Sequence, residues 1–176
     1  MPQDLRYPIG PFQRVEELTE VQRASRISEI EEAPARLSAA VAGLTPPQLD
    51  TPYRPGGWTV RQLVHHIADS HMNAFTRFKL ALTENEPTIK TYEESLWAEL
   101  ADTRTPPIES SLAIVENLHK RWVILLRSIQ PTDWRRKFRH PEWGLATVDF
   151  LLAQYAWHGR HHVAHITSLR ERSGWR

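Results

Sequence analysis

Residues 154–168 constrain this chain more than any other stretch, because they hold four of its nine histidines within eight positions. These are His158, His161, His162 and His165. The stretch has no proline and one glycine, so it can form a helix that turns by about 100° per residue. His158, His161 and His165 then share one face, and the rings of His161 and His165 can meet above one turn. Two imidazoles at this spacing supply half of a metal site.

The composition limits both the ligands and the class of protein. A chain of 176 residues fits one domain with a sizeable core. It has no cysteine, so a metal site must use His, Asp, Glu or water. The 22 basic and 21 acidic residues nearly balance, and the basic residues do not cluster in one block, which argues against nucleic-acid binding. Without an apolar run of about 20 residues or a signal-peptide pattern, we expect a cytoplasmic protein with no membrane partner.

Hydrophobic periodicity predicts an all-α fold, a four-helix bundle with long inter-helix loops. Apolar residues recur at three- and four-residue spacing in four segments, expected as helices over about 20–44, 60–83, 109–129 and 148–173. Thr19, Thr59 and Thr147 lie where helix N-caps are expected. Pro34 falls inside the first segment, where it should kink or split the helix.

The remaining segments are expected to lie outside the long helices of a single domain, 1–176. Residues 1–18 carry two prolines and a glycine within five positions, which predicts an extended arm lying on the body of the domain. The connection 84–107 should contain a short helix near 92–100, and 131–146 should form a second long loop with a small hairpin. Connections of this length are often functional.

A catalytic zinc takes three protein ligands and keeps one position open, so the histidine pair needs a third ligand. On a helical wheel of 60–83, His66 falls at the edge of the apolar arc, among polar residues. His71 falls inside the arc, as a core histidine would, and His65 falls on the opposite side, where a surface histidine is expected. The wheel gives His66 only a small lead over His71. His119 lies on the buried stripe of 109–129 and could be a ligand, a partner of a ligand, or part of the core.

Two long stretches of the sequence resemble the signatures of a known family, the YfiT group of the DinB-like superfamily. One is residues 56–73, Gly-Gly-Trp-Thr-Val-Arg-Gln-Leu-Val-His-His-Ile-Ala-Asp-Ser-His-Met-Asn, and the other is residues 157–166. Shorter matches at 7–10 and 50–54 extend the resemblance over essentially the whole chain. It implies a four-helix bundle with one metal ion on three histidines. Matched onto this sequence, the three are His66, His161 and His165.

The resemblance also implies a cellular location, an oligomeric state and a type of reaction for the protein. Members of the group are described as cytoplasmic, homodimeric, metal-dependent hydrolases that bind zinc or nickel. Relatives are S-transferases of low-molecular-weight thiols such as bacillithiol, mycothiol or glutathione. We therefore expect one Zn²⁺ per chain, with Ni²⁺ as the alternative, and a homodimer that takes a small thiol and an electrophilic substrate. Arg160 departs from the histidine of some members, which should alter the charge of the pocket rather than the ligands.

Two reactions could use such a site, and the sequence does not identify an individual catalytic residue for either. Three neutral imidazoles leave the full charge of the ion, which favours the thiolate form of a thiol and equally lowers the pKa of bound water to about 7. No carboxylate base is evident on the ligand faces, so thiol transfer leads and hydrolysis by metal-bound hydroxide is the alternative. A third hypothesis is a binding or dimerisation module with a structural metal. That metal would need a fourth protein ligand, such as His71, His158 or His162.

Overall fold

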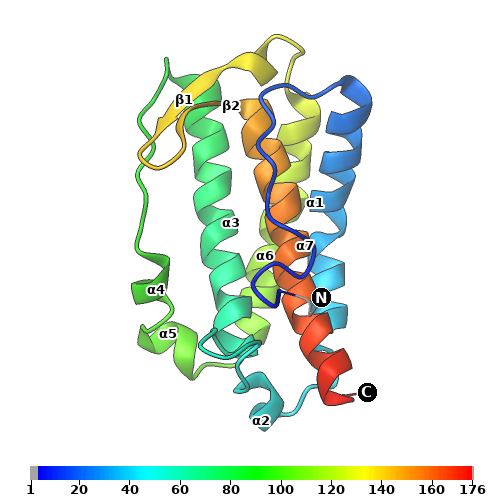
Figure 1. The fold of residues 1–176 in the computed structure, drawn as a ribbon. Helices are drawn as coiled ribbons and strands as arrows, with labels where there is room; N and C mark the ends of the chain where they lie inside the picture. The colour runs from blue at the N-terminus through cyan, green and yellow to red at the C-terminus, as the bar shows by residue number, and fades with distance from the viewer. Residues whose placement is uncertain (1–3, 176) are drawn as a thin grey trace.

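Four long helices form the body of the molecule in a computed structural model that describes residues 4–175 (Figure 1). They are α1 (Glu20–Val41), α3 (Val60–Thr83), α6 (Glu109–Ser128) and α7 (Val148–Ser173). Each of α1 and α3 packs against both α6 and α7, so the four helices surround one shared interior. The prediction of a four-helix bundle is confirmed.

The threonines that were expected to cap the helices do so. Thr59 and Gln62 form a capping box, in which Thr59 Oγ1 accepts from the Gln62 N–H at 3.1 Å and Gln62 Oε1 accepts from the Thr59 N–H at 2.9 Å. Thr147 Oγ1 accepts from the Phe150 N–H at 3.1 Å. Each bond satisfies a backbone donor that the first helical turn leaves free.

Of the two effects predicted for Pro34, a kink or a split of the first helix, the split does not occur. The helix α1 runs unbroken from Glu20 to Val41 with Pro34 inside it, and a separate short helix, α2 (Pro46–Leu49), follows. Packing of α1 against α6 on one side and α7 on the other holds the helix together despite the missing backbone donor.

The two long connections meet beside the C-terminal end of α3, at the top of Figure 1. The first contains two short helices, α4 (Glu94–Trp97) and α5 (Ala101–Arg104). The second contains a single 3₁₀ turn, η1 (Asp133–Arg135), followed by the expected hairpin, in which β1 (Lys137–His140) pairs antiparallel with β2 (Gly144–Thr147). Backbone bonds from Ile89 N to Arg139 O and from Arg139 N to Pro87 O join the first connection to β1.

The described part of the N-terminal arm, residues 4–18, runs along the outside of α7 (Figure 1). Trp157 Nε1 donates to Gly10 O at 3.3 Å. At the end of the arm, the buried Asp149 accepts from the Leu18 N–H at 3.0 Å and from two guanidinium nitrogens of Arg23, each at 2.7 Å. This carboxylate therefore ties the arm and α1 to the first turn of α7. Residues 1–3 of the predicted arm lie outside the described part.

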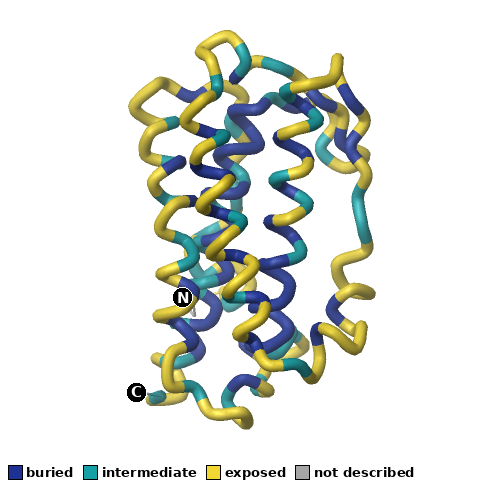
Figure 2. The backbone as a smooth tube through the Cα atoms, turned by 180° about the vertical axis from the view of Figure 1, so that it is seen from behind, coloured by how far each residue is buried: buried dark blue, intermediate teal, exposed yellow. Residues whose placement is uncertain are grey.

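The interior of the bundle consists of two apolar clusters with a polar layer between them. Figure 2 shows the inner sides of the helices buried and their outer sides exposed. One cluster surrounds Trp122 and Phe78, and the other surrounds Leu63 and Ile166. The positions between the two clusters carry histidines from three helices: His66, His71, His119, His158, His161, His162 and His165. None of the helices within residues 4–175 combines the length and apolar character needed to cross a bilayer.

Candidate metal centre

All nine histidines are buried, including His65, whose predicted surface position is wrong. His65 Nδ1 lies 2.7 Å from Ser111 Oγ, and His65 Nε2 lies 3.4 Å from the carbonyl oxygen of Pro106. These contacts join α3 to the start of α6, so His65 has a structural role. The wheel could not show this, because the segment that covers His65 comes from a distant part of the sequence.

Three histidines from α3 and α7 bring their ring nitrogens together at the centre of the polar layer. The nitrogens of His66, His158 and His162 lie within 4.8 Å of one another. The Nε2 atoms of His158 and His162, which are four residues apart on α7, are separated by 3.1 Å. The ring centroid of His66 lies 5.5 Å from that of His158 and 4.9 Å from that of His162. Three imidazoles converging in this way fit the donor set of a zinc-class ion.

A second group of ligand nitrogens within 4.8 Å of one another comes from His161, His162 and His165, all on α7. Its Nε2 atoms of His161 and His165 are 3.0 Å apart. Among the described residues, the structure thus does not gather the predicted set of His66, His161 and His165 into one group. It places His66 with the other i, i+4 pair of the helix, His158 and His162, three residues earlier.

The rotation of α7 about its axis explains this division. A step of three residues turns the helix by about 300°, so the second pair points about 60° away from the first. His161 stacks on Trp157 with ring centroids 4.3 Å apart, and His165 packs on Tyr53 at 4.2 Å. The second pair therefore faces aromatic side chains of α7 itself and of the loop before α3, and the first pair faces His66.

Burial keeps the three converging histidines neutral. It lowers the pKa of His66 to about 4. Burial, reinforced by the neighbouring histidines, also lowers the pKa of His158 and His162 well below the usual range. A neutral imidazole has a nitrogen lone pair to offer a cation, whereas an imidazolium has none. Within residues 4–175, the Nδ1 atom of His162 is also buried without a hydrogen-bond partner, so this ring is not fully satisfied by the protein.

His71 and His119 do not join this donor set but stand in line behind it. His158 Nδ1 lies 3.2 Å from His71 Nε2, and His71 Nδ1 lies 2.8 Å from His119 Nε2. On the far side of His119 from His71, His119 Nδ1 lies 2.6 Å from the carbonyl oxygen of Ile30. Of the positions left open by the sequence, His119 thus lies behind the converging histidines rather than among them, and His71 lies between His119 and His158.

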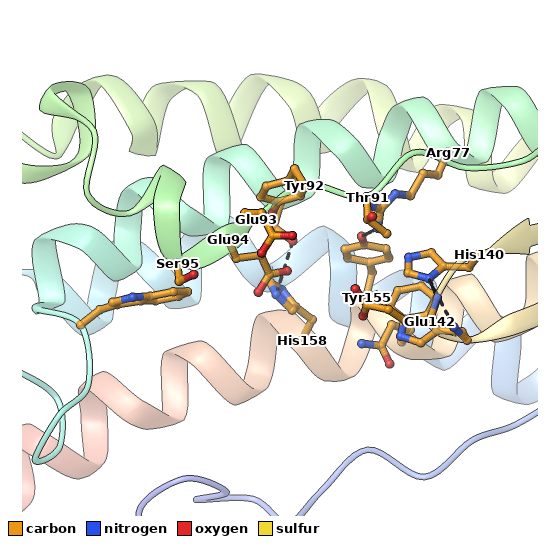
Figure 3. A pocket seen from close by; sticks show the side chains of 14 residues that line it. Arg77, Thr91, Tyr92, Glu93, Glu94, Ser95, His140, Glu142, Tyr155 and His158 are labelled. Atoms are coloured by element: carbon orange, nitrogen blue, oxygen red, sulfur yellow. Dashed lines mark hydrogen bonds between the residues drawn. The ribbon is translucent and has the colours of Figure 1, made fainter.

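A cavity of about 370 Å³ opens beside His158 (Figure 3). Its walls come from α3, the connection that contains α4, the hairpin and α7. The buried Arg77 donates to Tyr155 Oη at 2.9 Å at one end of the cavity. Three carboxylates, Glu93, Glu94 and Glu142, also line it. Although Glu94 lies at the exposed rim, partial desolvation and then the charge of Glu142 raise the pKa of its carboxyl.

These carboxylates were missed from the sequence because they lie on the two connections rather than on the ligand-bearing helices. The only signal was the length of the connections. Arg160, in contrast, does not enter the cavity. Its Nε atom lies 3.2 Å from a carboxylate oxygen of Glu29 on α1, so the expected effect on the charge of the pocket does not arise there.

Comparison with known proteins shows the family to which this chain belongs. The family model of the DinB superfamily matches residues 29–166. A protein of Bacillus mycoides (strain KBAB4) named "Putative metal-dependent hydrolase" is 56% identical over 172 residues, which cover 98% of this chain and 99% of that protein. A protein of the same name from Bacillus cereus (strain ATCC 10987 / NRS 248) is 55% identical, with the same coverage.

Solved structures give the same result. YfiT from Bacillus subtilis, described as "a probable metal-dependent hydrolase with an unusual four-helix bundle topology", matches with a TM-score of 0.95 and 48% identity over 98% of this chain and 99% of that one. TT2238, a four-helix bundle protein, matches with a TM-score of 0.55 and 18% identity over 80% of this chain and 94% of that one, which supports the fold alone. The family match and the relatives both span most of the sequence, and the chain belongs to the DinB superfamily.

Proposed function

We propose that this protein is an enzyme that holds one divalent metal ion, of the zinc class, on His66, His158 and His162. The observation that carries the proposal is the convergence of three buried, neutral imidazoles beside a cavity. Three protein ligands with one position left open are typical of a catalytic zinc site, whereas a structural site is closed by four. The proposal keeps His66 from the set implied by the family resemblance and replaces His161 and His165 by His158 and His162.

The names of the relatives support metal dependence, and the chain's own residues support a small substrate. When bound, a zinc-class ion would supply a Lewis acid that favours the deprotonated form of a thiol or of water. The cavity of about 370 Å³ has room for a small molecule next to His158, and Arg77 supplies a buried positive charge in its wall. Because the chain has no cysteine, a thiol nucleophile would have to enter as a separate molecule.

The reaction we propose is the transfer of a low-molecular-weight thiol to an electrophile. The thiolate forms a bond to the electrophilic carbon, and the leaving group or the displaced electron pair takes up the proton from the thiol. A thiolate needs no further deprotonation for attack, so the protein's task is to bind and orient the two reactants.

Hydrolysis is a second candidate, and one observation favours it. The carboxyl group of Glu94 lies on the cavity wall with a raised pKa, which suits a residue that accepts and returns a proton. The sequence-based preference for thiol transfer assumed that no such carboxylate was near, and the structure removes that assumption.

A paired assay on the zinc-loaded protein tests both candidates. One arm follows conjugation of several small thiols to a chromogenic electrophile, and the other follows hydrolysis of aryl esters. We expect metal-dependent conjugation that is lost in His158→Ala and retained in Glu94→Gln. Metal-dependent ester turnover that falls in Glu94→Gln, with no metal-dependent conjugation, would establish hydrolysis instead. Bound zinc with neither activity would contradict the proposed function.

A further inference from the structure

The proline inside α1 leaves a backbone carbonyl of that helix free for another partner. In a regular helix, the carbonyl of residue 30 accepts from the N–H of residue 34. Residue 34 is proline, which has no N–H. The Ile30 carbonyl is buried with its residue, which is 1% exposed, and it accepts from His119 Nδ1 at 2.6 Å. Pro34 thus creates the acceptor at which the line of histidines begins.

A carbonyl oxygen can only accept, and this fixes the direction of every bond in the line. His119 must carry its proton on Nδ1, so a neutral His119 has a bare Nε2. That atom can only accept, and it therefore takes the Nδ1 proton of His71 at 2.8 Å. The same argument makes His71 Nε2 accept from His158 Nδ1 at 3.2 Å. At the end of the line, the Nε2 atom of His158 is left with its lone pair.

The free lone pair is on His158 Nε2, the ring nitrogen that faces another proposed ligand, His162. His158 Nε2 lies 3.1 Å from His162 Nε2 and 3.4 Å from Ser70 Oγ. Both neighbours can donate to a bare nitrogen, so the contacts agree with the direction of the line in the metal-free protein. Burial also lowers the pKa of His71 well below the usual range and that of His119 to about 4, in agreement with the neutral rings that these contacts describe.

We propose that His119 and His71 are positioning residues that, anchored on the Ile30 carbonyl freed by Pro34, set the tautomer and orientation of the metal ligand His158. We call Ile30, His119, His71 and His158 the histidine relay. This role deepens the proposed function and rests on the ligand role of His158. Partners behind a metal-binding histidine generally fix its tautomer, and their loss weakens metal affinity by about 10–100-fold.

Nitrogen NMR of the metal-free protein tests the relay directly. Long-range proton–nitrogen spectra of protein labelled with ¹⁵N-histidine show which ring nitrogen of each histidine carries the proton. We expect the Nδ1–H form for His119, His71 and His158. A proton on Nε2 of any of these three rings would overturn the proposal. The spectra need no bound metal, so the relay is tested even if the wild-type protein binds no zinc, an outcome that would refute the proposed function instead.

A set of variants then tests whether the relay acts on metal binding. His119→Leu removes both bonds of this ring, whereas the side-chain oxygen of His119→Gln can still accept from His71 Nδ1. Zinc affinity, measured by competition with a chromophoric chelator, should fall by about 10–100-fold in His119→Leu and be largely rescued in His119→Gln. Val115→Ala, four residues earlier on the same helix and buried outside the relay, should lose stability without losing zinc affinity. A folded His119→Leu protein with wild-type zinc affinity would overturn the proposal.

Discussion

Two histidine pairs on α7 have the same spacing, nearly the same separation and different surroundings. The Nε2 atoms are 3.1 Å apart in the pair His158 and His162, and 3.0 Å apart in the pair His161 and His165. The first pair has His66 beside it and the histidine relay behind it. The second pair packs on aromatic rings, and the Nδ1 atom of His161 is buried with no partner within residues 4–175.

This comparison shows that the distance between two imidazoles does not make a metal site by itself. What distinguishes the first pair is a third imidazole from another helix, His66 on α3, and, for His158, a hydrogen-bonded partner that fixes its tautomer. In the second pair, His161 is stacked on Trp157, whereas in the first pair His158 is hydrogen-bonded to His71. Stacking fixes the plane of an imidazole ring but does not determine which ring nitrogen carries the proton.

The largest expected difference between the pairs is in metal affinity. His158→Ala and His162→Ala each remove a proposed ligand, and we expect a loss of zinc affinity of more than about 1,000-fold, or about 4 kcal/mol. His161→Ala and His165→Ala should keep one zinc per chain, which elemental analysis of the purified proteins will show. If His161→Ala and His165→Ala lost the metal while His158→Ala and His162→Ala kept it, the second pair and not the first would supply the metal ligands.

The pH dependence of stability should not distinguish the two histidine groups, because burial lowers the pKa of His66 in the first group and of His161 in the second alike to about 4. Both start from 6.5, so the unfolded chain binds more protons between pH 6.5 and 4, and stability is lost as the pH falls through this window. For His66 the loss between pH 7 and pH 5 is about 2 kcal/mol.

Chemical denaturation of the metal-free protein at the two pH values measures this loss. The wild type should lose about 2 kcal/mol more than His66→Gln over the interval. His161→Gln should change the slope in the same direction and by about the same amount, because burial lowers the pKa of His161 to about 4 as well. A pH-independent stability of the wild type would show that these histidines are not held neutral in the fold.

The smallest expected effects come from the aromatic rings that cover each group. Trp58 packs on His66 with ring centroids 4.7 Å apart, and Tyr53 packs on His165 at 4.2 Å. Trp58→Leu and Tyr53→Leu should each cost about 0.5–1.5 kcal/mol of ring-pair energy in thermal or chemical unfolding. Only Trp58→Leu should also weaken zinc binding, by a few-fold, and a larger zinc effect of Tyr53→Leu would point to the second pair.

Much of the fold could be predicted because it depends on local patterns. The capping threonines and the periodicity of 60–83 and 148–173 locate α3 and α7 at their observed bounds. Pro34 does not split α1, because a proline that breaks an isolated helix is tolerated where two other helices pack on it. The sequence shows that Pro34 has no N–H to donate to the Ile30 carbonyl. Only the tertiary structure shows that His119 donates to this carbonyl instead.

The site could be predicted only in part, for a reason that the two pairs make clear. Periodicity indicates that α7 carries two histidine pairs, but the pair that faces His66 depends on how α7 is rotated against α3. That rotation is set by packing along the whole helix, so the wheel retained His158 without being able to select it. Glu94 could not be found by any helical pattern, since the fold of a long connection brings it to the cavity.

A zinc-edge anomalous diffraction map of zinc-loaded crystals tests the central claim most directly, since it locates the ion without reference to activity. We predict one anomalous peak per chain, within bonding distance of His66, His158 and His162, at about 2.0–2.1 Å from their nitrogens. A peak on His161 and His165 in place of these three, or no peak in the histidine layer of a zinc-saturated protein, would contradict the account.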